Sequence, residues 1–190
     1  MSIENRNRIL GCALRLFASH GYAAVGVQEI VDEAGITKPT LYHYFGSKLG
    51  LLESLLENNI SQRDAVLIPA TTYQGDITNT LNQSAQELFR FARHNPTFYR
   101  MYLALWFAPP ESEAFQAASP YHLQLHAAFE TLFEQSARDH GNMRGRQRAF
   151  AASFLGLLHT YIGLGLNGLN DLDDTQAYQV VHQFMHGIFS

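Results

Sequence analysis

The side chains with the clearest chemical use lie in one short stretch near the N-terminus, Lys38 to Phe45. Its sequence, KPTLYHYF, places two apolar anchors, Leu41 and Phe45, at i, i+4 spacing, so that the lysine, threonine, tyrosines and histidine between them point largely outward. Two tyrosines and a histidine that face only water are costly, whereas the same groups can meet phosphates and base edges. This stretch therefore indicates a surface that binds nucleic acid.

The neighbouring elements predict how this stretch is held. Val27–Ala34 has the apolar spacing of a short helix, Gly35–Ile36–Thr37 forms a turn with Thr37 as N-cap, and Pro39 sits in the first turn of a helix over Lys38–Phe45. A preceding helix ends at Gly21 and carries its apolar face on Leu10, Ala13, Leu14, Phe17 and Ala18. A helix-turn-helix is therefore predicted from Val27–Ala34, the turn and Lys38–Phe45, and its second helix, Lys38–Phe45, would dock in the major groove of DNA.

The rest of the chain has helical periodicity and no convincing strand pattern, so the expected fold class is all-α. Amphipathic helices are expected near 47–63, 76–94, 96–107, 113–139, 145–166 and 173–188. The charge is uneven: residues 1–50 hold five basic and four acidic side chains (+1), the rest hold eight and thirteen (−5), and the sum is −4. A small DNA-binding region joined to a more acidic remainder of the chain would show this asymmetry.

Composition excludes several classes of protein. With 46% hydrophobic and 16% charged residues, the chain is expected to be ordered and globular. Cys12 is the only cysteine, so no internal disulfide forms and a reducing compartment is expected. We find no secretion signal and no apolar run of membrane-spanning length, which predicts a cytoplasmic protein without a membrane partner.

The N-terminal region, residues 1–47 and called the head below, resembles the TetR family of bacterial transcriptional regulators. The resemblance is carried by Leu16–Phe17, Gly21–Tyr22, Gln28–Glu29–Ile30, Ala34–Gly35 and above all by ITKPTLYHYFGSK over residues 36–48. It implies an N-terminal three-helix DNA-binding domain over residues 1–47, followed by a helical effector-binding and dimerisation domain over residues 48–190. The expected partners are a double-stranded DNA operator, a small-molecule effector and a second copy of the chain, with no cofactor.

Carried over residue by residue, the resemblance implies two kinds of DNA contact. Lys38, Pro39, Thr40 and His43 would face base edges or nearby backbone, while Tyr42, Tyr44 and Lys48 would hold phosphates. Gly26 stands where the family often has a hydroxyl residue that touches a phosphate, so that contact is in doubt. Gln28 stands where the family often has arginine, and it could pair with an adenine edge in place of a guanine.

Residues 48–190 carry two further sets of candidate residues. Aromatic and polar side chains could line a ligand cavity, although the first interpretation for such residues is packing in the core. The candidates are Phe98, Tyr102, Trp106, Phe129, Phe133, Phe154, His159 and Tyr161. Apolar side chains of the last two helices could form a four-helix dimer interface, with intramolecular packing as the alternative; they are Phe150, Leu157, Leu158, Val181, Phe184, Met185 and Ile188.

Other patterns resemble known sites without their context. Gly163, Gly165 and Gly168 match G-x-G-x-x-G but close a helix, so close helix packing followed by a frayed helix C-terminus is expected in place of a nucleotide site. The pairs His122/His126 and His182/His186 have metal-ligand spacing but lack further ligands, so surface or interface histidines and no metal are expected. No catalytic signature is present.

The sequence therefore predicts a homodimeric, ligand-responsive repressor that binds a pseudo-palindromic operator. The competing interpretation is a helical small-molecule-binding protein or enzyme whose head no longer binds DNA.

Overall fold

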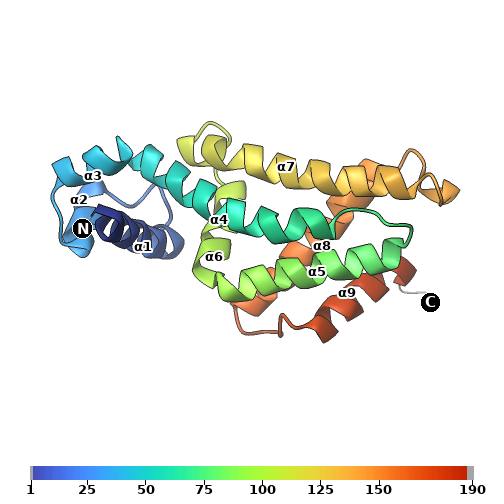
Figure 1. The fold of residues 1–190 in the computed structure, drawn as a ribbon. Helices are drawn as coiled ribbons and strands as arrows, with labels where there is room; N and C mark the ends of the chain where they lie inside the picture. Colours follow the sequence, from blue (N-terminus) through green and yellow to red (C-terminus); the bar gives the residue numbers. More distant parts are fainter. Residues whose placement is uncertain (1, 188–190) are drawn as a thin grey trace. The chain divides into compact units, whose positions relative to one another are not determined.

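In a computed structural model that describes residues 2–187, the chain is built from α-helices and one short 3₁₀ helix (Figure 1). The helices are α1 (Ser2–His20), α2 (Val27–Ala34), α3 (Lys38–Phe45), α4 (Lys48–Ala70), α5 (Ile77–His94), α6 (Pro96–Trp106), α7 (Glu113–Ser136), η1 (Gly141–Met143), α8 (Gln147–Leu166) and α9 (Asp174–His186). Residues 2–187 contain no strand, which confirms the all-α prediction. The predicted ends of α2 and α3 are also confirmed.

The chain divides into two compact units. The first consists of the chain up to Ser61 together with Thr97–Pro120, and the second of Gln62–Pro96 and the chain from Tyr121 onward. Helices α4 and α7 therefore contribute residues to both units. The division into a DNA-binding domain over 1–47 and an effector domain over 48–190 is a functional one and stays a prediction.

The first unit contains the predicted helix-turn-helix. Helix α2 packs on both α1 and α3. Its buried side chains are Ile30, Val31 and Ala34, at the spacing of one helix face. Gly35 ends α2 with φ +61°, and the Ile36 N–H donates to the Val31 carbonyl, a left-handed helix end that glycine adopts without a Cβ penalty.

The second unit is built around contacts of α5 with α8 and α9 and of α8 with α9. Its core includes an aromatic cluster drawn from three helices, in which adjacent ring centroids lie 4.9–6.4 Å apart. The members are Phe129, Phe133, Phe150, Phe154 and Phe184.

Of the three glycines near the end of α8, only Gly165 serves the close packing that was predicted, whereas Gly163 and Gly168 have open space at the Cβ position. A Cβ on Gly165 would lie 2.6 Å from Cγ of Leu172, so only glycine lets the loop after α8 approach this closely. Gly168 has φ +72° just beyond the helix end. No strand precedes these residues within the described chain, so the G-x-G-x-x-G match is not a dinucleotide fingerprint.

Helix α8 corrects one expectation. By length and composition alone it could cross a membrane, contrary to the prediction that no apolar run reaches that length. Core helices of water-soluble proteins pass the same test, so this property is weak support for a membrane span. Only 28% of the residues in the apolar window are buried within the single chain.

Candidate nucleic-acid interface

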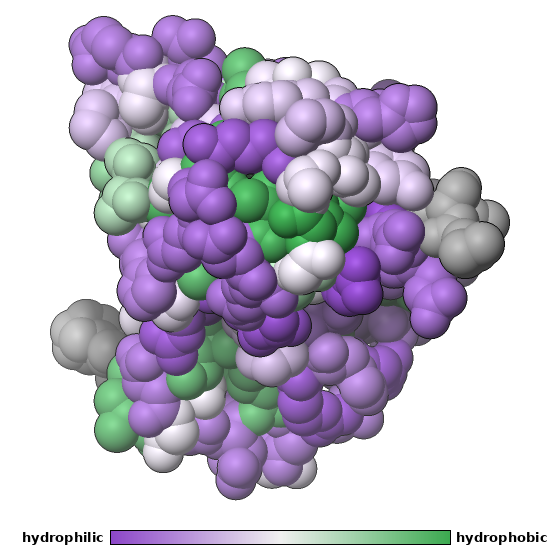
Figure 2. All heavy atoms as spheres, turned by 90° about the vertical axis from the view of Figure 1, so that its left-hand side faces the viewer, coloured by the Kyte–Doolittle hydropathy of each residue, from purple (hydrophilic) through white to green (hydrophobic). Residues whose placement is uncertain are grey.

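Helix α3 has the inward and outward faces that the sequence predicts. Leu41 is fully buried and Phe45 is 8% exposed, so together they fix the helix to the head. The outward side chains include Tyr42, which is 45% exposed. Lys38, Pro39 and His43 are exposed as well, and Thr40 and Tyr44 are half-buried. Figure 2 views the side on which α3 lies in Figure 1, and hydrophilic residues predominate on it.

The two ends of α3 are defined by backbone geometry. Thr37 has the extended conformation of an N-cap, with φ −104° and ψ 157°, and its carbonyl accepts the Leu41 N–H at 3.1 Å. Its hydroxyl does not cap the helix and instead lies 3.0 Å from the Thr40 hydroxyl. At the other end, the Gly46 N–H donates to the Tyr42 carbonyl at 2.8 Å. The exposed surface of α3 is thus only two turns long.

Helix α2 presents Gln28 beside this surface. The Gln28 side chain is exposed, and its Nε2 donates to Oδ1 of Asp32, one turn further on, at 2.7 Å. This hydrogen bond orients the amide and must be exchanged if Gln28 is to pair with an adenine edge. Gly26 is the N-cap of α2 and offers no side-chain hydrogen bond, so the structure has no hydroxyl at this position.

Lys48 has a structural role that helical periodicity does not reveal. Its Nζ donates to the carbonyls of Tyr22 and Val25, both at 3.1 Å, and lies 4.2 Å from the Tyr22 ring centroid. Two of the three N–H donors of this ammonium group therefore stabilise the turn between α1 and α2. Phosphate binding by Lys48 stays a prediction, since the group has one further N–H to offer.

Arg6 lies beside α3, although no local sequence pattern selects it. Its guanidinium carbon lies 5.4 Å from the ring centroid of Phe45, at the end of α3. By contrast, Arg15 on α1 is paired with Glu33 on α2 at 2.8 Å, which joins the two helices. Arg15 thus stabilises the packing of α1 on α2, whereas Arg6 lies beside the exposed helix α3.

The predicted ligand residues fall into both units. In the first unit, Phe98 stacks on Tyr102 with ring centroids 5.8 Å apart, and both are buried. Trp106 stacks on Phe115 at the same distance. In the second unit, the three predicted phenylalanines, Phe129, Phe133 and Phe154, belong to the aromatic cluster and are fully buried. The Tyr161 hydroxyl lies 3.4 Å from the Gln183 amide oxygen.

His159 lies in a basic and largely dry environment in the second unit. Burial, together with the charges of His126 and Arg63, lowers the pKa of His159 to about 4. Burial also lowers the pKa of His126, partly opposed by Glu130. The imidazole of His159 is therefore neutral at pH 7 and can serve as a hydrogen-bonding group inside an apolar region.

One prediction for the paired histidines is wrong. His122 is 1% exposed, with its ring centroid 6.5 Å from that of His159, because α8 covers this side of α7; it is not a surface residue. His182 and His186 are exposed as predicted, with ring centroids 4.5 Å apart. Residues 2–187 contain no group of three or more histidine, cysteine, aspartate or glutamate residues that could hold a metal ion.

The predicted dimer residues differ in their exposure within one chain. Leu158 and Val181 are fully buried and pack inside the second unit. The four that remain half-buried are Phe150, Leu157, Phe184 and Met185. Ile188 lies outside the described residues. The half-buried residues are therefore the ones that a second copy could cover.

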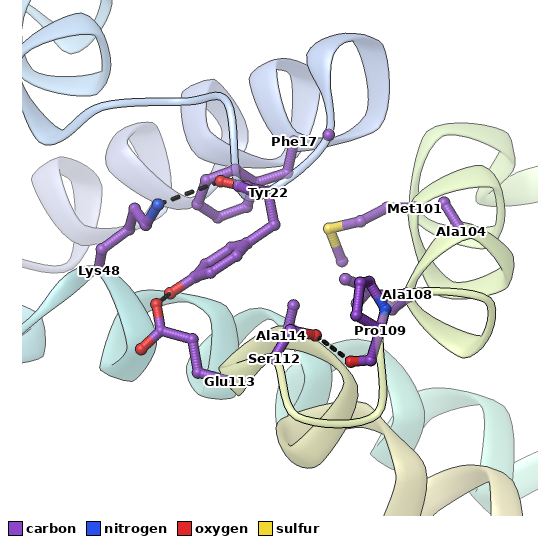
Figure 3. A pocket seen from close by; sticks show the side chains of 13 residues that line it. Phe17, Tyr22, Lys48, Met101, Ala104, Ala108, Pro109, Ser112, Glu113 and Ala114 are labelled. Carbon is purple, nitrogen blue, oxygen red and sulfur yellow. Dashed lines mark hydrogen bonds between the residues drawn. The ribbon is translucent and has the colours of Figure 1, made fainter.

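A pocket of about 520 Å³ lies in the first unit, and none of the eight predicted ligand residues lines it (Figure 3). In this pocket the Tyr22 hydroxyl donates to Oε1 of Glu113 at 2.5 Å. Burial, together with this carboxylate, raises the pKa of the Tyr22 hydroxyl well above its ordinary value of 10. The two residues are 91 positions apart, so no local sequence pattern could have paired them.

Known proteins are similar to this chain both in the sequence of the head and in the fold of the whole chain. Residues 9–55 match the family model of bacterial regulatory proteins, tetR family. FasR of Mycolicibacterium smegmatis, an HTH-type transcriptional activator, is 27% identical over 184 residues, which cover 97% of this chain and 82% of FasR. KstR of the same organism, an HTH-type transcriptional repressor, is 34% identical over 93 residues, 49% of this chain and 46% of KstR.

The fold is also that of solved regulators. The crystal structure of FadR from Bacillus subtilis in complex with stearoyl-CoA aligns with a TM-score of 0.78 at 18% identity, over 96% of this chain and 98% of FadR. The helix-turn-helix over α2 and α3, the match across residues 9–55 and the likeness to FasR over nearly the whole chain agree. Residues 9–55 therefore match the tetR family of bacterial regulatory proteins, and most of the chain is similar to HTH-type transcriptional regulators.

Proposed function

We propose that this regulator is a ligand-responsive repressor that binds a pseudo-palindromic operator as a homodimer in the cytoplasm. The outward face of α3 carries the proposal: Tyr42 and His43 are exposed on a helix that Leu41 and Phe45 hold in place. Such a face can enter a major groove without rearrangement of the head. Residues 1–47 would read the operator, and residues 48–190 would bind the effector and the second copy.

Helix α8 supports the dimer. It is apolar over most of its length, yet only 28% of its apolar window is buried in one chain. A second copy of α8 and α9, packed about a two-fold axis, would cover the half-buried Phe150, Leu157 and Phe184. The two copies of α3 would then read successive major grooves when they are separated by about 34–36 Å, one turn of DNA.

We infer that the effector has an apolar body and binds in the second unit. The aromatic cluster around Phe154 and the neutral His159 supply apolar contacts and a polar group in one region. FadR of the same fold binds stearoyl-CoA in its crystal structure, which shows that the fold can admit a long apolar chain. A ligand that favours a dimer with another spacing of α3 must weaken operator binding, by linkage.

Selection of genomic fragments by the purified protein tests the proposal and identifies the operator. The selected duplex is then titrated at several salt concentrations, and we expect affinity to fall steeply as salt rises. Tyr42→Ala should weaken binding, while Tyr178→Ala, which removes another exposed tyrosine on α9, should not. Undetectable binding to every fragment would favour a helical binding protein whose head no longer reads DNA.

The sign of regulation needs its own measurement, because FasR is an activator and KstR a repressor. Transcription from the selected promoter is measured in vitro with and without the protein. A decrease in transcript on addition of the protein supports repression, whereas an increase contradicts it. Selection of duplexes with Gln28→Arg in the same experiment tests whether this position sets base preference.

A further inference from the structure

We propose that the pocket in the first unit is a second ligand site, for a neutral and mostly apolar small molecule that carries one hydrogen-bond donor. All of its lining residues belong to this unit. Its volume of about 520 Å³ lies within the range of known small-molecule sites, roughly 300–1,000 Å³. The site is separate from the effector region proposed in the second unit.

The walls of the pocket are mainly apolar. Phe17 and Tyr22, at the end of α1 and in the following turn, lie on one side, and Met101, Ala104 and Ala108, on α6 and just after it, lie on the other (Figure 3). An apolar molecule between them would displace water from both walls, which is the main source of affinity in such sites.

The charged groups of the pocket argue against an ionic ligand. Lys48 and Glu113 bear opposite charges, so they cancel. The Lys48 ammonium is already bound to the Tyr22 and Val25 carbonyls, so an anion would have to compete with these bonds and would also face the carboxylate of Glu113. A buried cation would face Lys48 in turn.

The polar group most suited to a ligand is the Glu113 carboxylate. One of its oxygens accepts from the Tyr22 hydroxyl, and its second oxygen has lone pairs for a further donor. A ligand with a single N–H or O–H could donate to it while its apolar body occupies the space between the walls. This requirement defines the ligand class as neutral, apolar and carrying one donor.

Direct binding of N-phenyl-1-naphthylamine tests the site, because this fluorophore is neutral, apolar and has one N–H donor. Two substitutions fill the pocket from opposite walls, Ala104→Phe and Ala23→Phe, and both replace exposed side chains. Ala65→Phe is the matched control, since Ala65 is exposed on a helix and does not line the pocket. Circular dichroism and thermal unfolding establish that each variant is folded.

We expect saturable binding to the unsubstituted protein and to Ala65→Phe, and at least about tenfold weaker binding to both pocket-filling variants. Equal binding to all four proteins would place the fluorophore elsewhere and overturn the proposal. Absence of binding to the unsubstituted protein would overturn it as well. No DNA is present in this experiment, so its failure would leave the proposed repressor function intact.

Occupation of the pocket should also change operator affinity, an expectation that rests on the proposed function. An occupant would touch the turn after α1, which Lys48 holds to the rest of the head, so it should change affinity for the selected operator. The fluorophore is added to the operator titration of the unsubstituted protein and of Ala104→Phe. A change in affinity that the substitution abolishes supports the coupling, and an unchanged affinity refutes it.

Discussion

Tyr22→Phe isolates the hydrogen bond between the DNA-binding head and the start of α7. The substitution keeps the ring, which lies 5.0 Å from Phe17 and beneath the Lys48 ammonium, and removes only the hydroxyl. Hydrogen bonds to charged groups contribute about 1.5–3 kcal/mol. Glu113 is exposed and regains water when the hydroxyl is lost, so we expect a loss of about 1.5 kcal/mol, at the low end of that range.

Urea unfolding at fixed protein concentration measures this loss, because the concentration of a dimer affects its apparent stability. A double-mutant cycle with Glu113→Ala, which removes the acceptor, assigns the loss to the pair, and a coupling energy of about 1 kcal/mol is expected. Tyr178→Phe, which removes an exposed hydroxyl, should change stability by less than about 0.5 kcal/mol. Zero coupling between Tyr22 and Glu113 would refute the reasoning.

The raised pKa of Tyr22 determines how the difference in unfolding free energy between the unsubstituted protein and Tyr22→Phe depends on pH. Because the folded state raises the pKa of this hydroxyl above the unfolded value of 10, its stabilising contribution is fully present below pH 10. The contribution is lost as the pH rises toward the higher pKa of the folded state. The difference between the unsubstituted protein and Tyr22→Phe should therefore be constant from about pH 6 to 9 and shrink at higher pH.

Three further outcomes are expected. Lys48→Met should cost about 1–3 kcal/mol in urea unfolding by removing the donor to two carbonyls, whereas Lys38→Met should leave stability unchanged and reduce the salt slope of operator binding by about 1. Thermal unfolding should show that Gly165→Ala destabilises the protein and that Gly163→Ala, with open space at its Cβ, does not. Because the pKa of His159 is about 4 in the folded state, stability should fall by about 3 kcal/mol from pH 6.5 to pH 4, and His159→Gln should remove this fall.

The sequence predicted the head well because local signals define it. Glycines end α2 and α3, and Thr37 and Pro39 mark the start of α3, so the bounds of both helices follow from residues within them or next to them. The end of α7 was predicted three residues too late. Beyond Ser136 the backbone continues in tighter i to i−3 hydrogen bonds from Arg138 and Asp139, which apolar periodicity does not detect.

Contacts between distant residues could not be predicted in the same way. The hydrogen bond from Tyr22 to Glu113 and the two from Lys48 depend on which carbonyls and carboxylates the fold brings near. His122 illustrates the converse, because its burial depends on a helix that begins 25 residues further along the chain. Helix periodicity identifies a buried face only from its apolar residues, so a polar residue on that face is assigned to the surface.

The shortness of α3 has a thermodynamic consequence for DNA binding. An isolated helix of two turns is unstable in water, so α3 owes its order to the burial of Leu41 and Phe45. Since these side chains are already buried before DNA arrives, the head loses little conformational entropy on binding. Calorimetry of operator binding should then give a smaller negative heat-capacity change than a coupled folding reaction, which buries about 1,000–3,000 Å².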